Sequence, residues 1–444
     1  MLRRLTSRVP ETLKRPYSAS DRRIPRTFIQ PAQRFAALET AGGIVMLVGA
    51  VIALLWANSP WSDSYRELLE TTIQFRIGDL VDLDLTLHEW INDGLMTLFF
   101  LVVGLEIKRQ LVHGELRDRR AAALPALAAL GGMLVPALIY ILINLGGAVE
   151  GFGIPVATDI AFAVGVVTLV GSRVPLGVRI FILTLAVVDD IGGIVVIAVF
   201  YAESVSPVWL VAAALCVGGA LLARSMEIRS LIPYILLGMV CWYSMHQAGV
   251  EAAIIGVIFG LLTPAEPFHD PSRFGERVEG FIEHFELDEH PVPAQISSYV
   301  REAASPLDRI EYRLGPWVAF LIVPIFAIAN AGVSVSTDGL DMNVFAGVAV
   351  GLVLGKLVGV VAFTWLAVRL GVGRLPQRTG WGHMVAIGAT AGIGFTVALF
   401  VAGLSFDDPD LLRSAKLGIL AASVTAGLLG YVLLRRVAAR STPD

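Results

Sequence analysis

The sequence predicts an all-α polytopic membrane protein with twelve transmembrane helices. Hydrophobic residues make up 55% of the 444 residues and charged residues only 16%, whereas about 25% of the residues in a soluble domain are charged. Apolar runs of about 18 residues or more recur along the chain, and each is long enough to cross a hydrocarbon core of ~30 Å as a helix. The composition therefore argues against a soluble helical domain.

A basic segment, residues 1–34, precedes the first apolar run. Residues 1–30 contain eight Lys and Arg against two acids, Glu11 and Asp21. They include no apolar region of the kind that secretory signal peptides contain. We expect this segment to be a disordered cytosolic tail, and an Arg-rich, acid-poor organelle transit peptide is the alternative.

The twelve predicted spans fall into two blocks, residues 35–263 with spans one to eight and residues 313–436 with spans nine to twelve. They lie at about 35–57, 88–107, 121–145, 154–170, 176–201, 207–223, 230–247, 249–263, 315–333, 343–368, 382–404 and 412–434. Lys and Arg test this count, because cytoplasmic loops are enriched in them. With the N-terminus in the cytoplasm, 29 of the 34 Lys and Arg fall inside, four fall outside, and Lys356 alone lies within a span. Both termini, including the tail 437–444, are therefore expected to be cytoplasmic.

Two segments between the spans have a character of their own. Residues 72–88 alternate apolar and polar side chains around Gly78-Asp79, which predicts a short extracellular β-hairpin, with an irregular loop as the alternative. A solitary hairpin is marginally stable in water, so pairing with a second copy would stabilise it, and we predict a homodimer through this hairpin. Residues 264–312 form an acidic cytosolic loop on which we impose no fold.

Spans four and eleven contain residues that interrupt helices. Thr158 and Asp159 lie early in span four, where they are able to end one helix and cap the next. Gly388, Gly392 and Gly394 lie in span eleven, where they either permit unwinding or allow close helix packing. Span four is the second span in the group 121–201, and span eleven is the second in the group 343–434. Broken helices at matching positions in two halves are typical of transporters built from inverted-topology repeats.

Four ionisable residues lie deep in the spans: Asp159, Asp189, Asp190 and Lys356. A charged side chain at the bilayer centre costs about 2.5–3.5 kcal/mol on insertion scales, so each is a functional candidate. A buried ion pair that fixes helix packing is the alternative. Neighbours on a helix diverge by about 100°, so Asp189 and Asp190 are expected to have different roles.

Lys356 is the one cation inside a predicted span, and it lies beside glycines spaced four residues apart, Gly347, Gly351, Gly355 and Gly359. Such a stripe lets another helix approach closely, and we expect it to bring Lys356 to span five. Two carboxylates with backbone carbonyls and a hydroxyl form an oxygen site for a small cation. The same oxygens cannot hold a proton and a cation at once, so competition with alternating access gives exchange of cation for protons.

Several motifs resemble the bacterial NhaA Na⁺/H⁺ antiporters. They are "WINDGLMTLFFLVVGLEIKR", "IPVATDIAFAVGV", "AVVDDIGGIVV", "GKLVG", "GIGFT" and "AKLGIL". The resemblance covers residues 35–265 and 310–436. It implies inverted repeats with spans four and eleven crossed and discontinuous, and electrogenic exchange of Na⁺ or Li⁺ for protons in the bacterial inner membrane, serving pH and sodium homeostasis.

The resemblance also implies roles for individual residues. Asp189 and Asp190 would bind Na⁺ or Li⁺ and protons, Thr158 and Asp159 would support the site, and Lys356 would pair with Asp189 or with helix dipole ends. Glu106 and Arg109 match charges of a cytoplasmic funnel linked to pH response, and Glu311 is retained with them. No resident cofactor and no nucleic-acid partner are expected, only the transported ions, the lipid bilayer and a second copy of the chain.

The chain departs from the family pattern at positions that bear on pH response. Gln110 follows Arg109 where the family often has an acid, and Glu251 stands where some members have a histidine. Tyr312 and Gly315 replace histidines of well-known members. These differences concern the pH profile and leave the residues of the exchange site unchanged.

Three other functional classes are less consistent with the sequence. Intramembrane aspartyl proteases place two aspartates on separate helices in a GxGD context, whereas here the pair is contiguous and GxGD is absent from the sequence. An acid-lined cation channel would be expected to show a repeated pore loop. A non-transporting sensor would be separated from an antiporter by a flux assay. We therefore predict a transporter and not an enzyme.

Overall fold

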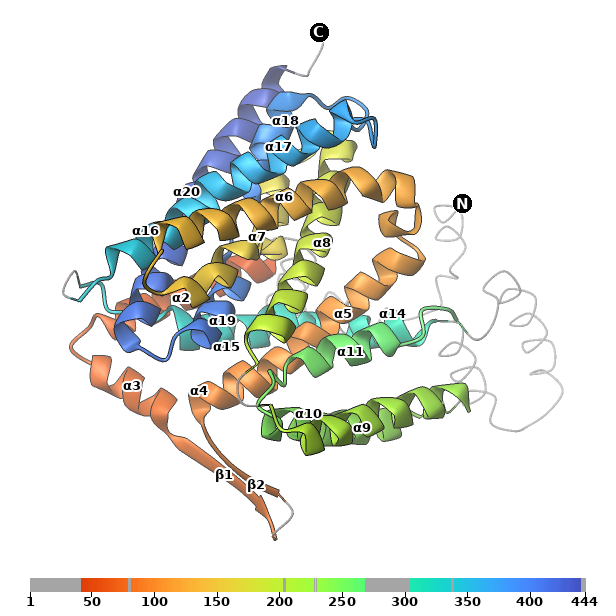
Figure 1. The fold of residues 1–444 in the computed structure, drawn as a ribbon, viewed down its shortest axis with the longest axis vertical. Coiled ribbons are helices and arrows are strands. Elements are labelled where there is room, and N and C mark those ends of the chain that lie inside the picture. The colour runs from red at the N-terminus through yellow and green to blue at the C-terminus, as the bar shows by residue number, and fades with distance from the viewer. Residues whose placement is uncertain are drawn as a thin grey trace, which may run out of the picture.

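The computed structural model describes residues 41–78, 81–202, 205–226, 228, 230–267, 304–336 and 339–440. The basic segment 1–34 and most of the acidic loop 264–312 lie outside these residues. Within them the protein is mostly helical, with one two-stranded sheet (Figure 1).

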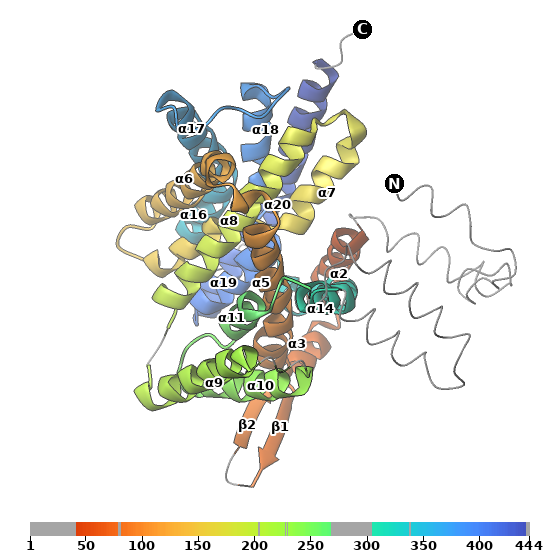
Figure 2. The same cartoon turned by 90° about the vertical axis from the view of Figure 1, so that its right-hand side faces the viewer.

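The described chain begins with α2 (Ala41–Ala57), which bends by 113° into the short helix α3 (Ser62–Glu70). Strands β1 (Thr72–Ile77) and β2 (Val81–Thr86) follow and pair antiparallel, with Phe75 opposite Leu83. Both views show this hairpin projecting away from the helical body (Figures 1 and 2). It occupies the residues for which alternation predicted a hairpin.

The chain then continues through further helical elements. They are α4 (Leu87–Glu89), η5 (Trp90–Leu95), α5 (Met96–Val112), η6 (Glu115–Arg117), α6 (Arg119–Ile143), η7 (Val149–Val156), α7 (Ile160–Val170), η8 (Gly171–Arg173), α8 (Leu176–Phe200), α9 (Pro207–Ser225), α10 (Leu231–Gln247), α11 (Ile254–Leu262), α14 (Pro306–Trp317), η10 (Val318–Ile322), α15 (Val323–Ala331), α16 (Met342–Val350), η11 (Gly351–Gly355), α17 (Lys356–Arg369), α18 (Trp381–Ala391), α19 (Phe395–Ser405) and α20 (Pro409–Arg440). Of these, η5, η10 and η11 are single π-helical turns inside longer helices.

By helix length and hydropathy, the described residues contain fewer membrane spans than the predicted twelve. Eight helical segments are long and apolar enough to cross a membrane, or ten if each of two bent pairs counts as a span. Where spans seven and eight are predicted, α10 has 17 residues, at the lower limit for a crossing, and α11 has 9. The helical membrane architecture is therefore observed, and the count of twelve remains a prediction.

Two helices extend into the predicted acidic loop and the predicted C-terminal tail. Helix α14 begins at Pro306, inside the segment assigned to the acidic loop, because Ser305 caps it by accepting a hydrogen bond from the Asp308 amide at 3.0 Å. Proline at the first helical position completes this start signal. Helix α20 continues to Arg440, beyond the predicted start of the C-terminal tail.

The glycine stripe along α16, η11 and α17 packs against α6, the third predicted span (Figure 1). A Cβ atom on Gly359 would lie 2.1 Å from the carbonyl oxygen of Gly131, and one on Gly355 would lie 2.8 Å from Cα of Pro136. The two backbones therefore touch directly. Helix α11 approaches α5 in the same way, since a Cβ on Gly256 would lie 2.1 Å from the carbonyl oxygen of Thr97.

Both helices that were predicted to be interrupted contain a short non-helical stretch. The 3₁₀ helix η7 ends at Val156 and α7 begins at Ile160. Helix α18 ends at Ala391 and α19 begins at Phe395, with a bend of 46°. Backbone of this kind is tolerated at membrane depth only where it is buried in protein or lines a cavity.

Replacing Gly359 by alanine is expected to lower the free energy of unfolding by about 1–3 kcal/mol, because the added methyl group overpacks the contact with Gly131. The measurement is thermal unfolding of the detergent-solubilised protein, followed by tryptophan fluorescence. Gly218→Ala in α9 is the control, since a Cβ there meets nothing within 4 Å. Equal melting temperatures for both variants and the wild type would show that the close approach is not needed for stability.

Candidate functional site

Asp189 and Asp190 lie next to each other in the middle of α8. Asp189 is completely buried, and Asp190 keeps 9% of its surface exposed. Because successive residues of a helix point about 100° apart, the two carboxylates have different surroundings.

The Asp189 carboxylate contacts two predicted site residues. Its Oδ2 atom forms an ion pair with Lys356, and it accepts a hydrogen bond of 2.5 Å from the Thr158 hydroxyl. Lys356 and Thr158 are both completely buried. The other oxygen, Oδ1, is buried and has no hydrogen-bond partner. Asp189 therefore has one oxygen, Oδ2, that is bound by Lys356 and Thr158, and a second oxygen, Oδ1, that is free to accept a further hydrogen bond or ligand.

Lys356 reaches Asp189 from the first position of α17, directly after the π-helical turn η11. A π-turn adds a residue to the helical repeat and frequently occurs at functional sites. The ammonium group also donates to the carbonyl oxygen of Val156, the last residue of η7. A buried cation is thus matched by one carboxylate and by the carbonyl end of a broken helix, where the helix dipole is negative.

Asp190 lies at a small, mostly apolar pocket. The pocket is lined by Asp190 together with Phe99, Phe100, Val103, Ile194, Ile197 and Val397. The Oδ1 atom of Asp190, like that of Asp189, is buried without a partner. Because buried polar atoms are nearly always hydrogen-bonded, two such oxygens on neighbouring residues mark the aspartate pair as the candidate functional site.

The described residues contain no group of three or more His, Cys, Asp or Glu side chains placed to hold a metal ion. A cation at Asp189 and Asp190 would therefore take its other ligands from carbonyl, hydroxyl or water oxygens. Such ligand sets suit hard cations.

Thr158 and Asp159 join the interruption of η7–α7 to that of α18–α19. The Thr158 hydroxyl lies 2.8 Å from the carbonyl oxygen of Ala391, and the Asp159 amide donates to the carbonyl oxygen of Ile393 at 2.6 Å. The Asp159 carboxylate, 3% exposed, accepts from the amide of Phe162 at 3.2 Å. The two breaks therefore satisfy each other's backbone groups.

Thr396 is a contact of this site that the sequence analysis did not single out. Its hydroxyl donates to Oδ2 of Asp159 at 2.6 Å, and its amide donates to the same oxygen at 3.1 Å. Thr396 belongs to the "GIGFT" motif at residues 392–396, and this motif was the signal available in the sequence. Local spacing gave no reason to pair Thr396 with an aspartate 237 positions away.

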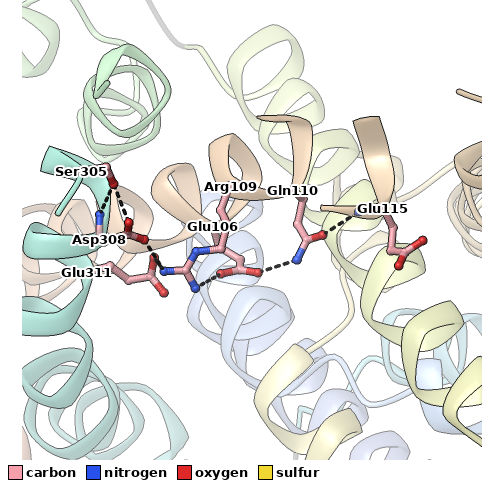
Figure 3. A network of polar contacts seen from close by, with 7 residues as sticks. All are labelled: Glu106, Arg109, Gln110, Glu115, Ser305, Asp308 and Glu311. Atoms are coloured by element: carbon pink, nitrogen blue, oxygen red, sulfur yellow. Dashed lines mark hydrogen bonds and ion pairs between the residues drawn. The ribbon is translucent and has the colours of Figure 1, made fainter. Parts of the chain in front are cut away.

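Glu106, Arg109 and Glu311 form a second cluster with Asp308, which joins α5 to α14 (Figure 3). The Arg109 guanidinium lies 3.7 Å from Glu106 and 3.4 Å from Asp308, and it also forms an ion pair with Glu311. One cation on α5 thus faces three carboxylates, two of them on α14.

The structure adds three polar groups to this cluster. Gln110 donates to Glu106 at 2.9 Å, and Ser305 donates to Asp308 at 2.7 Å (Figure 3). Asp308 and Ser305 were not predicted, because nothing in the local sequence shows that α14 packs on α5. Glu251, another departure from the family pattern, accepts a hydrogen bond from the Ala253 amide at 3.0 Å just before α11.

Comparison with known proteins gives one consistent family. Residues 33–434 match the family model described as Na⁺/H⁺ antiporter 1. The chain is 46% identical to Na⁺/H⁺ antiporter NhaA 2 of Myxococcus xanthus, covering 93% of this chain and 90% of that protein. It is 43% identical to Na⁺/H⁺ antiporter NhaA of Rhodopirellula baltica, covering 92% and 94%. The solved sodium proton antiporter MjNhaP1 from Methanocaldococcus jannaschii has the same general fold, with a TM-score of 0.53, 12% identity and coverage of 93% and 99%.

Lys356→Ala is expected to destabilise the protein by about 3–5 kcal/mol, because it leaves the Asp189 carboxylate buried without its counter-ion. Asp189→Asn in the same chain removes that charge. The loss of unfolding free energy in the double variant is therefore expected to be smaller than the sum of the losses in the two single variants. Thermal unfolding of the four proteins measures this coupling. The pair Asp84→Asn and Lys356→Ala is the control, because Asp84 is exposed on the hairpin, and additive effects for Asp189 and Lys356 would contradict the ion pair.

Proposed function

The chain belongs to the Na⁺/H⁺ antiporter 1 family, and on this premise we propose that it is an electrogenic antiporter that exports Na⁺ or Li⁺ in exchange for protons. One observation supports the proposal most strongly. Asp189 and Asp190 each carry a buried oxygen without a partner, and they do so beside two interrupted helices. In this proposal the cation and the protons compete for these carboxylates, and alternating access exposes them to each side in turn.

The competition follows from the chemistry of the groups. A protonated carboxylate has lost the negative charge that attracts a cation. Conversely, a bound cation favours the ionised carboxylate and lowers its affinity for a proton. Asp190, at the pocket, would meet the cation first. Asp189 would contribute its free Oδ1, while its Oδ2 stays with Lys356 and Thr158. No resident cofactor enters this scheme.

The finer architecture is part of the proposal: twelve spans in inverted repeats, with spans four and eleven crossed. Hydrogen bonds between Asp159 and Ile393 and between Thr158 and Ala391 support it. Asp159 would offset the positive ends of α7 and α19, and Lys356 the negative end of η7.

We further propose that Glu106, Arg109 and Glu311 adjust the activity to pH. Three carboxylates around one guanidinium support this role, because protonation of any of them changes the balance of charge between α5 and α14. Gln110 contributes an amide to this cluster and no additional acid.

The setting of the transporter is proposed from the sequence pattern and the family. It is a multi-pass protein of the bacterial inner membrane with both termini in the cytoplasm, and it works in pH and sodium homeostasis. The hairpin β1–β2 would join two copies, since its projection from the helical body leaves it accessible (Figure 2).

In liposomes with a pH dye inside, a Na⁺ or Li⁺ gradient is expected to move protons through the wild type and not through Asp190→Asn. The asparagine keeps the size of the side chain but holds neither a proton nor a charge that attracts the cation. Asp84→Asn, on the exposed face of the hairpin, is the matched control and should behave as the wild type. Proton movement that survives in Asp190→Asn would rule out the proposed site.

Two acids in one site predict that more than one proton moves per cation, so net charge crosses the membrane in each cycle. Imposing a potential across the liposome membrane with K⁺ and valinomycin is therefore expected to change the rate of Na⁺-driven proton movement and, with the sign reversed, to change it in the opposite direction. A rate independent of the imposed potential would indicate electroneutral exchange.

A further inference from the structure

We propose that Thr396 is a positioning residue of the exchange site, and this inference rests on the proposed function. Its hydroxyl holds Asp159 so that one carboxylate caps the N-termini of both α7 and α19. The Asp159 carboxylate is thereby fixed between the two interrupted helices. Its neighbour Thr158 is positioned with it and in turn holds the Asp189 carboxylate.

Helix α19 begins without a side-chain cap of its own. Its N-cap residue is Gly394, which has no side chain, and no side-chain cap hydrogen bond is made there. The first amides of any helix lack intrahelical partners. At α19 the Thr396 amide is satisfied instead by Oδ2 of Asp159, which comes from the other broken helix.

The two oxygens of Asp159 are divided between the two helices. Oδ1 accepts from the Phe162 amide and caps α7, for which Asp159 is the N-cap residue. Oδ2 accepts from Thr396 and caps α19. With Asp159 3% and Thr396 4% exposed, water has little access to compete for these bonds.

The hydroxyl of Thr396 is the part of this arrangement that depends on residue type. Any residue at position 396 except proline would supply the amide. The buried threonines Thr364 and Thr390, inside α17 and α18, donate to the carbonyl four residues earlier in their own helix, to Val360 at 2.6 Å and to Ala386 at 2.8 Å. Thr396 is only the second residue of α19, and its hydroxyl donates to Asp159 at 2.6 Å instead.

A continuous set of contacts leads from Thr396 to the aspartate pair. Asp159 is fixed by Thr396, its neighbour Thr158 lies 2.8 Å from the carbonyl oxygen of Ala391, and Thr158 also donates to Asp189. Loss of the Thr396 hydroxyl therefore weakens the positioning of Thr158 and Asp189 without removing any group that would touch the cation.

The test compares Thr396→Val and Thr396→Ser in liposomes, with Thr364→Val as the matched control. Valine keeps the shape of threonine and removes the hydroxyl, so the apparent KM for Na⁺ is expected to rise about tenfold, as loss of one hydrogen bond to a charged group would produce. The maximal rate should change less than KM. Serine restores the hydroxyl and should return KM towards the wild-type value, and Thr364→Val should leave KM unchanged.

A wild-type KM in Thr396→Val would overturn the inference, and so would a serine variant that behaves like valine. Failure of the proposed function looks different, because the wild type itself would then move no protons. In that case the contact is tested by thermal unfolding of Thr396→Val, Asp159→Asn and the double variant. Non-additive effects support the contact, and additive effects overturn it.

Discussion

Burial of charge inside an apolar helical bundle is the constraint on which the rest of this structure depends. An unpaired charge at membrane depth is costly, so each buried ionisable group must be matched within the protein. Lys356 meets Asp189 and the carbonyl of Val156, and Asp159 meets the amides of two helices. Asp189 and Asp190 each keep a buried oxygen without a hydrogen-bond partner among the described residues, and the position of these two oxygens defines the candidate site.

Breaking two helices inside the bundle makes this matching possible. An intact helix uses its own amides and carbonyls internally, whereas an interrupted one presents free amides at one end and free carbonyls at the other. Here the free groups of η7, α7, α18 and α19 satisfy one another or satisfy Asp159, Thr158 and Lys356.

Close backbone packing brings the groups within reach. Glycines of the continuous helix α16–η11–α17 let its backbone touch that of α6 directly. Glycines of α11 and α5 likewise let these two helices touch each other. The π-helical turn before Lys356 then sets the direction in which its long side chain leaves the helix. Positions without side chains thus determine where the charged side chains meet.

The sequence by itself determined the membrane class, the hairpin segment, the interrupted spans and the buried residues Asp159, Asp189, Asp190 and Lys356, because each follows from local composition or spacing. Motifs also determined the family. Only the tertiary structure decided that Lys356 pairs with Asp189, that α6 packs on the glycine stripe, and that Asp308 and Thr396 belong to the two clusters. These partners lie far apart along the chain, Lys356 and Asp189 by 167 residues and Thr396 and Asp159 by 237. Helix periodicity sets the direction of a side chain around its own axis, but the neighbour it meets is fixed by how the helices pack.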